Sequence, residues 1–231
     1  MRCINVKLVI ITNAAGGLNP NFNIGDVFAI SDSIALPHLT GVNSLMGPND
    51  SELGPRFQPV SNAYSEELLD VAKQAAKALH FDFFHEEGTY CFVSGPMYES
   101  KAECKFLRQL GGDAVGMSTI PEVVAAHHSG MKVLGLSLVT NKVVMPGDKG
   151  PAANHEEVIE AVDKRALQMQ AFVKKIVEIL KSDILPNTST PKQLNLTVPK
   201  PSIAEKIPLQ TIVLGVVALA AGFMIGKARA S

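Results

Sequence analysis

Two polar side chains stand at the ends of apolar runs in this 231-residue chain. Glu99 follows a run that ends in Gly95-Pro96-Met97-Tyr98, and Asn141 follows Ser137-Leu138-Val139-Thr140. In open α/β sheets, ligands collect where buried strands end. A carboxylate only accepts hydrogen bonds, whereas an amide both donates and accepts them. Together they match a flat heterocycle with an N–H edge, a carbonyl oxygen and a ring nitrogen, which are the features of a 6-oxopurine.

These side chains need a sheet to position them, and the hydrophobic pattern predicts one. Short apolar runs predict strands over 6–11, 27–30, 90–93, 114–116 and 133–139, and helical spacing predicts helices over 65–79, 100–110, 121–128 and 154–181. Residues 31–61 contain four prolines and no long period, so we expect a long irregular loop there. Alternating strands and helices predict an α/β fold with a layered mixed sheet flanked by helices.

The bulk composition restricts the partners. With 21 basic and 22 acidic residues, the chain has no general field for nucleic acid, so we expect a small-molecule ligand. The three cysteines, Cys3, Cys91 and Cys104, have no metal-ligand spacing and predict reduced thiols in an intracellular protein without a metal site. No secretory leader pattern opens the chain.

The composition changes after residue 182. Residues 183–207 are rich in Pro, Ser, Thr and Asn and predict a flexible linker. Within 208–226, the residues from Leu209 onward lack charge over about 18 positions, near the length that crosses a hydrocarbon core of about 30 Å. We expect this single apolar helix to be a tail anchor that holds the rest of the protein on the cytoplasmic face of an intracellular membrane, such as the mitochondrial outer membrane. The alternative is an apolar helix docked on a cytosolic domain.

Six segments, in order and spacing, resemble the trimeric purine nucleoside phosphorylases. They are Thr12–Asn19, Gly47–Asp50, Glu87–Tyr90, Gly95–Glu99, Val115–Glu122 and Ala153–Glu157. The resemblance runs from about residue 6 to about residue 180, so residues 1–182 are expected to form a phosphorylase domain that lacks the family's N-terminal part. It implies the nucleoside phosphorylase fold, a homotrimer, no cofactor, and phosphorolysis of inosine-type or guanosine-type nucleosides with inorganic phosphate as co-substrate.

The resemblance also implies roles for individual residues. Asn141 bonds purine N7 and O6, Glu99 accepts from N1–H, and His155 bonds the ribose 5′-hydroxyl. Further substrate contacts are expected from Tyr98, which stacks on the purine, from the ribose-facing Tyr90 and Met117, and from Thr140 and Val143. Ala14 and Ser118 match phosphate-contacting positions, and Phe57 matches an aromatic residue that closes the neighbouring subunit's pocket.

Several of these residues have simpler interpretations. An Asn at a strand end is often a turn former, and a Glu before a helix often interacts with the helix dipole. His155 is alternatively a surface histidine at a helix start, and Phe57 an aromatic that anchors its own loop. The adjacent His127 and His128 belong to no motif and are interpreted as ordinary surface or core residues.

The phosphate contacts are the weak part of the pattern. The family's glycine-rich loop, arginine and histidines have no counterpart in residues 1–6. A dianion held by two neutral contacts is poorly aligned, and misalignment lowers rates steeply. The sequence therefore predicts an enzyme with impaired activity. One alternative is a weak or inactive membrane-anchored purine-binding remnant, and another is a methylthioadenosine phosphorylase-like enzyme, although that family resembles a chain with Asp at the position of Asn141, suited to a 6-amino group.

Overall fold

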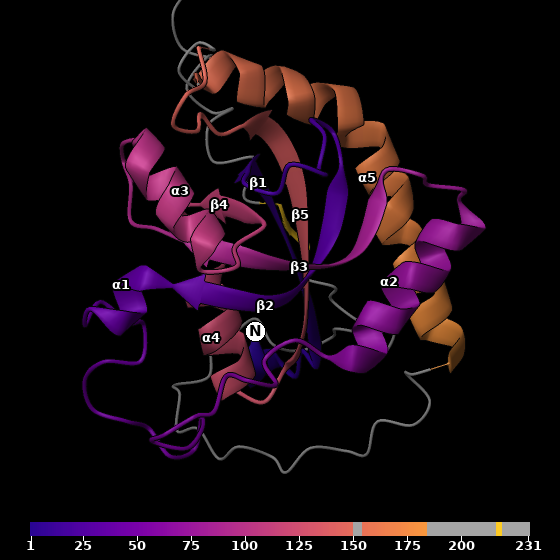
Figure 1. Ribbon diagram of the computed structural model, residues 1–231. Helices are drawn as coiled ribbons and strands as arrows, with labels where there is room; N and C mark the ends of the chain where they lie inside the picture. Colours follow the sequence, from indigo (N-terminus) through magenta and orange to yellow (C-terminus); the bar gives the residue numbers. More distant parts are fainter. Residues whose placement is uncertain (150–153, 184–215, 219–231) are drawn as a thin grey trace, which may run out of the picture.

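Strands and helices alternate along the computed structural model, which describes residues 1–149, 154–183 and 216–218 (Figure 1). The strands are β1 (Leu8–Gly17), β2 (Val27–Ala35), β3 (Phe84–Phe92), β4 (Ala114–Gly116), β5 (Lys132–Lys142) and β6 (Val216–Ala218). The helices are the 3-10 helix η1 (Arg2–Ile4), α1 (Leu36–Leu39), α2 (Glu66–Ala78), α3 (Lys101–Gln109), α4 (Ile120–His128) and α5 (His155–Asp183). The predicted α/β class with a mixed sheet is confirmed.

The sheet has the strand order β4-β3-β2-β5-β1-β6. Strand β5 pairs in parallel with β1 and antiparallel with β2, and β3 runs parallel to both β2 and β4. Strand β4 also pairs antiparallel with β1, through Gly16 opposite Val115 and Gly17 opposite Ala114. The strands β4, β3, β2, β5 and β1 therefore form a closed ring of backbone hydrogen bonds.

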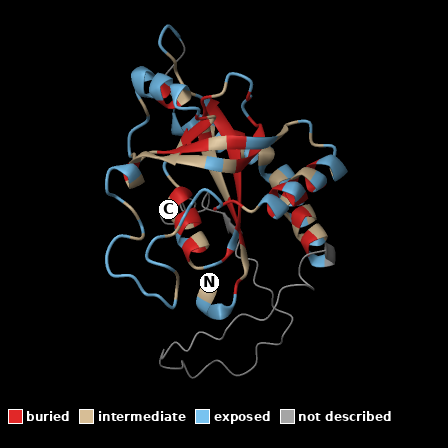
Figure 2. Ribbon diagram, turned by 60° about the horizontal axis from the view of Figure 1, so that its bottom comes forward, coloured by how far each residue is buried: buried red, intermediate tan, exposed pale blue. Residues whose placement is uncertain are grey.

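The two faces of the sheet bury separate clusters of apolar side chains. Figure 2 shows that the buried residues are concentrated in the strands and along parts of the helices. Helices α2 and α5 lie side by side on one face, where Leu68 and Phe172 meet strand residues such as Leu134 (Figure 1). On the other face, Val123 of α4 packs against residues such as Ile30. Helix α3 contributes to a smaller cluster beside β4. The site residues thus sit on strands that are held from both sides.

Strand β1 is longer than the sequence predicts. The predicted strand ends at residue 11, but pairing with β5 continues through Gly17. Small residues allow this, because a Cβ at Gly17 would lie 2.9 Å from Val139 Cγ1 and one at Gly16 would lie 3.0 Å from Val143 Cγ1. Strands β2 and β3 also extend beyond the predicted 27–30 and 90–93. The irregular loop predicted over 31–61 is therefore shorter than expected, and it begins only after α1.

The apolar helix predicted over 208–226 is not supported by the residues of this segment that the structure describes. Val216–Ala218 form a strand, β6, which pairs in parallel with β1 from Ile10 to Thr12. An exposed sheet edge offers unpaired N–H and C=O groups, and β-branched valines suit a strand, so a helix is not the structure at these positions. The rest of 208–226, and residues 184–207 of the expected linker, lie outside the described residues. Among the helices of the described part, none is both long and apolar enough to span a bilayer.

Candidate active site

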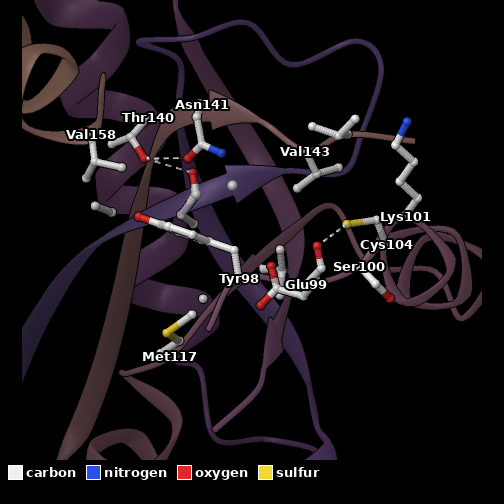
Figure 3. Close-up of a pocket in the computed structure, with 16 residues that line it drawn as sticks. Tyr98, Glu99, Ser100, Lys101, Cys104, Met117, Thr140, Asn141, Val143 and Val158 are labelled. Carbon is white, nitrogen blue, oxygen red and sulfur yellow. Dashed lines mark hydrogen bonds between the residues drawn. The ribbon is translucent and has the colours of Figure 1, made fainter. Parts of the chain in front are cut away.

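A cavity of about 430 Å³ lies where β1, β4 and β5 meet the start of α3 (Figure 3). Of the residues predicted from the sequence, it brings together Ala14, Tyr98, Glu99, Met117, Thr140, Asn141 and Val143. The Glu99 carboxylate and the Asn141 amide therefore line one cavity, although 41 positions lie between them along the chain. The closed ring of strands accounts for this, because it places the ends of distant strands beside one another.

Asn141 is positioned by its neighbour Thr140 at the end of β5. The Thr140 hydroxyl lies 3.2 Å from Asn141 Oδ1 and 3.3 Å from the carbonyl oxygen of Ala15 (Figure 3). Both side chains are buried, and among the described residues the amide nitrogen Nδ2 makes one hydrogen bond, a long one of 3.5 Å to the carbonyl oxygen of Lys142. With its oxygen engaged by Thr140, the amide offers N–H donors to a ligand, with the oxygen and nitrogen of the amide assigned by this network.

Glu99 is fixed by the start of helix α3. Ser100 is the N-cap, and its Oγ accepts from the N–H of Glu103 at 3.3 Å. In return, the Glu103 carboxylate accepts from the N–H of Ser100 at 2.7 Å. This reciprocal capping box sets the angle at which the chain enters the helix. Glu99, immediately before the cap, therefore has a defined backbone position at the cavity.

Burial raises the pKa of the Glu99 carboxyl above its usual range, and the nearby Glu103 adds to the effect, against a lowering by a hydrogen bond to its own backbone. At the cavity, the ionised carboxylate thus lacks part of the solvation that it would have in water. A ligand N–H that donates to it would replace that solvation. A raised pKa at a cavity is typical of groups that bind or react.

We expect Glu99→Gln to make the ligand-free protein more stable at about pH 7.5. The folded state holds the Glu99 proton more tightly than the unfolded state, so stability falls as the pH rises from about the ordinary value of 4.5 through the raised pKa. Glutamine carries no charge to desolvate, so the stability of the variant does not fall in this way as the pH rises. Urea unfolding at about pH 7.5 and about pH 4.5 measures the difference, which should shrink at the lower pH. The exposed Glu52→Gln is the control, and equal stability of Glu99→Gln and the parent at the higher pH would contradict the expectation.

Tyr98 and Met117 supply the apolar part of the cavity. The Tyr98 ring extends across it between the Thr140–Asn141 pair and Met117 (Figure 3). Met117 approaches Gly95 closely, since a Cβ at Gly95 would lie 2.4 Å from the Met117 sulfur, and the φ of +66° also favours glycine. An aromatic face and a thioether on a polar cavity suit a flat ring.

Four predicted site residues lie outside the lining of this cavity. Ser118 directly follows Met117, and its Oγ lies 3.2 Å from Thr119 Oγ1. Tyr90 is fully buried in β3, and burial raises its pKa to about 12. His155 is exposed at the start of α5, three positions before the cavity-lining Val158, and so shares its helix face. Phe57 is 88% exposed on the irregular loop, with the Arg56 guanidinium 6.0 Å from its ring centre.

The structure adds lining residues that the sequence did not single out, including Lys101, Cys104 and Val158. Lys101 Nζ donates to the carbonyl oxygen of Asp148 at 2.8 Å, which ties α3 to the segment after β5. The available signal for Lys101 was its place two residues after Glu99, at the start of the predicted helix. His127 and His128 instead contact the irregular loop, His128 through the carbonyl oxygen of Pro55 at 3.0 Å. In the described ranges, no three His, Cys, Asp or Glu side chains gather as a metal site would require.

Comparison with known proteins shows which family this chain resembles. Residues 1–178 match the family model of the phosphorylase superfamily. The chain is 46% identical over 176 residues to the purine nucleoside phosphorylase of Bos taurus, a match that covers 76% of this chain and 61% of the relative. It thus spans about 61% of the length of that curated relative.

Solved structures of a Schistosoma mansoni enzyme show the same likeness. The purine nucleoside phosphorylase of this organism in complex with adenosine superposes with a TM-score of 0.76 and 44% identity, over 78% of this chain and 64% of that one. Its complex with inosine gives a TM-score of 0.74 and 44% identity, over 76% and 62% of the two chains. That protein is therefore seen with both a 6-amino and a 6-oxo nucleoside.

Proposed function

Because the chain belongs to the phosphorylase superfamily, with a detailed likeness to the purine nucleoside phosphorylases, we propose that it binds 6-oxopurine nucleosides and supports their phosphorolysis to the free base and ribose 1-phosphate. The observation that carries the proposal is the joint placement of Glu99 and the Thr140-held Asn141 in one cavity. Such a pair matches the two hydrogen-bonding edges of hypoxanthine or guanine.

The roles follow from the chemistry of the leaving base. Phosphorolysis breaks the bond between purine N9 and the anomeric carbon, and negative charge develops on the base. The Asn141 amide bonds N7 and O6 and favours the base as N7 gains a proton, and Glu99 accepts from N1–H, so both stabilise the departing base electrostatically. Tyr98 covers the purine face, with Thr140 and Val143 beside it. Tyr90, Met117 and His155 are assigned to the ribose.

The co-substrate is inorganic phosphate, and the proposal includes no other cofactor. The N–H of Ala14 and the hydroxyl of Ser118 are assigned to it, in a neighbourhood of small residues that lets backbone donors approach an anion. Phe57 is assigned to the pocket of a neighbouring subunit in a homotrimer, which suits its exposure on the loop. The proposal does not include the tail anchor expected over 208–226, because Val216–Ala218 form a strand that pairs with β1.

A second candidate is a purine-binding protein with little or no turnover. Among the described residues that line the cavity, Lys101 is the one cation, and its ammonium donates to Asp148. A phosphate dianion then depends mainly on neutral donors, which align it less firmly than an arginine fork does. Turnover and base binding therefore need separate measurement.

A side-by-side assay of the purified full chain tests the proposal. With phosphate present, we expect kcat/KM for inosine to exceed that for methylthioadenosine by about tenfold or more, because the Asn141 amide suits a 6-carbonyl. Release of hypoxanthine or methylthioribose phosphate gives the rates. Preference for methylthioadenosine would contradict the assignment. Calorimetric binding of hypoxanthine without phosphate-dependent turnover would establish the second candidate instead.

A further inference from the structure

A chain of buried polar groups runs from the middle of the sheet to the turn before α4. The Ser137 hydroxyl on β5 donates to Asn13 Oδ1 on β1 at 2.6 Å. Asn13 Nδ2 donates to Thr119 Oγ1 at 2.8 Å, and Thr119 Oγ1 lies 3.2 Å from Ser118 Oγ. Ser137 and Thr119 are almost fully buried, with exposures of 0% and 1%. Buried networks of this kind persist when each member is satisfied.

Thr119 has a backbone conformation that its residue type disfavours. Its φ is +80° and its ψ is −56°, and the N–H of Ile120 donates to the carbonyl oxygen of Ser118 at 3.0 Å. This is a γ-turn of the rare, strained kind. A β-branched residue adopts it only where its surroundings hold it there. Here the Glu122 carboxylate accepts from the N–H of Thr119 at 3.2 Å, and Asn13 holds the side chain.

The direction of hydrogen donation along this network starts from Ser137. Ser137 gives its hydrogen to Asn13 Oδ1, which leaves Asn13 Nδ2 to donate to Thr119 Oγ1. Thr119 then has one hydrogen left, and the hydroxyl nearest to it by the distances given is Ser118 Oγ at 3.2 Å, with the Tyr90 hydroxyl close to both. When Thr119 donates to Ser118, the hydrogen of Ser118 remains for a further acceptor.

The free end of the network adjoins the cavity. Asn13 directly precedes Ala14 and Ser118 directly follows Met117, and both Ala14 and Met117 line the cavity. The buried hydroxyl of Tyr90 lies beside the hydroxyls of Ser118 and Thr119 and interacts with both, but it makes no hydrogen bond of ordinary length and angle within the described residues. A cluster of hydroxyls that is incompletely hydrogen-bonded at the edge of a cavity indicates a place where a polar ligand completes the hydrogen bonding.

We propose that Asn13, Thr119 and Ser137 are positioning residues that hold the Ser118 hydroxyl as a hydrogen-bond donor to an oxygen of phosphate. The inference rests on the proposed function, because it takes phosphate as the ligand beside Ser118. Asn13, Thr119 and Ser137 act through Ser118. Their removal should therefore weaken anion binding and leave base binding intact.

Thr119→Val and Thr119→Ser form a matched pair for the test. Valine keeps the branched shape but removes the hydroxyl, whereas serine keeps the hydroxyl. On the full chain, calorimetry with inorganic phosphate should show about tenfold weaker binding for Thr119→Val and binding within about threefold of the parent for Thr119→Ser. The affinity for hypoxanthine should change less than about twofold in both. Ser129→Ala, which removes a hydroxyl bonded to Ala125 at the other end of α4, is the control.

Ser137→Ala provides a second test if Thr119→Val does not fold. Ser137 is three hydrogen bonds away from Ser118, and its loss should also weaken phosphate binding selectively. Equal weakening of phosphate and hypoxanthine, or unchanged phosphate affinity, would overturn the inference. A parent chain that binds hypoxanthine but not phosphate would also overturn it while leaving base recognition intact. A parent chain that binds neither would overturn the proposed function itself.

Discussion

Replacing Asn141 with alanine is expected to lower kcat/KM for inosine by about two to three orders of magnitude, the usual cost of losing a preorganised donor to developing charge. Asn141 is 5% exposed, and Thr140 engages its oxygen, so the amide needs little reorganisation when the base departs. Water does not replace such a donor well, since it is neither fixed nor oriented. Initial rates of hypoxanthine release from inosine measure the effect.

Two further variants test whether the effect is specific to the Asn141 amide. Asn21→Ala removes an exposed asparagine and should leave the rate unchanged. Asn141→Asp should reverse the preference toward 6-amino nucleosides, because a carboxylate accepts from an amino group and repels a carbonyl oxygen. If Asn141→Ala kept more than about a third of the parent kcat/KM, Asn141 would not be the donor to the leaving base.

Phe172→Ala is expected to lower the free energy of unfolding by about 3–5 kcal/mol. Phe172 on α5 is fully buried, with its ring centre 5.1 Å from that of Phe84 and 5.8 Å from that of Phe81. Truncation leaves a cavity between α5 and the sheet that neighbouring rings fill only in part. Denaturant unfolding followed by far-ultraviolet circular dichroism measures the loss, since the chain has no tryptophan.

The same helix supplies the control for Phe172. Leu167 is 80% exposed, so Leu167→Ala should change stability by less than about 0.5 kcal/mol. A loss below about 1.5 kcal/mol for Phe172→Ala would mean that α5 is not anchored by this residue. Because α5 also presents Val158 to the cavity, the variant should bind hypoxanthine more weakly than the parent.

The sequence predicted most of the elements that carry the site. Asn141 follows the most apolar of the predicted strands, 133–139, and a buried strand was the natural interpretation of that run. Helical spacing likewise predicted the helix over 100–110, which begins directly after Glu99. Local signals of this kind identify strand ends and helix starts, and the α/β class then brings the two ends together.

Other features depend on contacts that the sequence does not display. Asn13 to Gly17 have the composition of a turn, yet they continue β1 because strands on both sides supply backbone partners. The strained turn at Thr119 depends on Asn13, which is 106 positions away. Hydropathy over 208–226 matched a membrane helix by length alone, and did not reveal that Val216–Ala218 pair with an available sheet edge.

The two walls of the cavity differ in how firmly the backbone holds them, because only one of them is part of the closed ring of strands. Ala14 to Gly16, Gly116 and Asn141 belong to strands of the ring, and widening the cavity on that side would break several backbone hydrogen bonds at once. The opposite wall consists of the segment around Tyr98 to Lys101 and the segment after β5, joined by the hydrogen bond from Lys101 to Asp148. We therefore expect bulky groups on a ligand to fit on the Lys101 side of the cavity. Groups that extend toward β1 should bind poorly, because that wall does not widen.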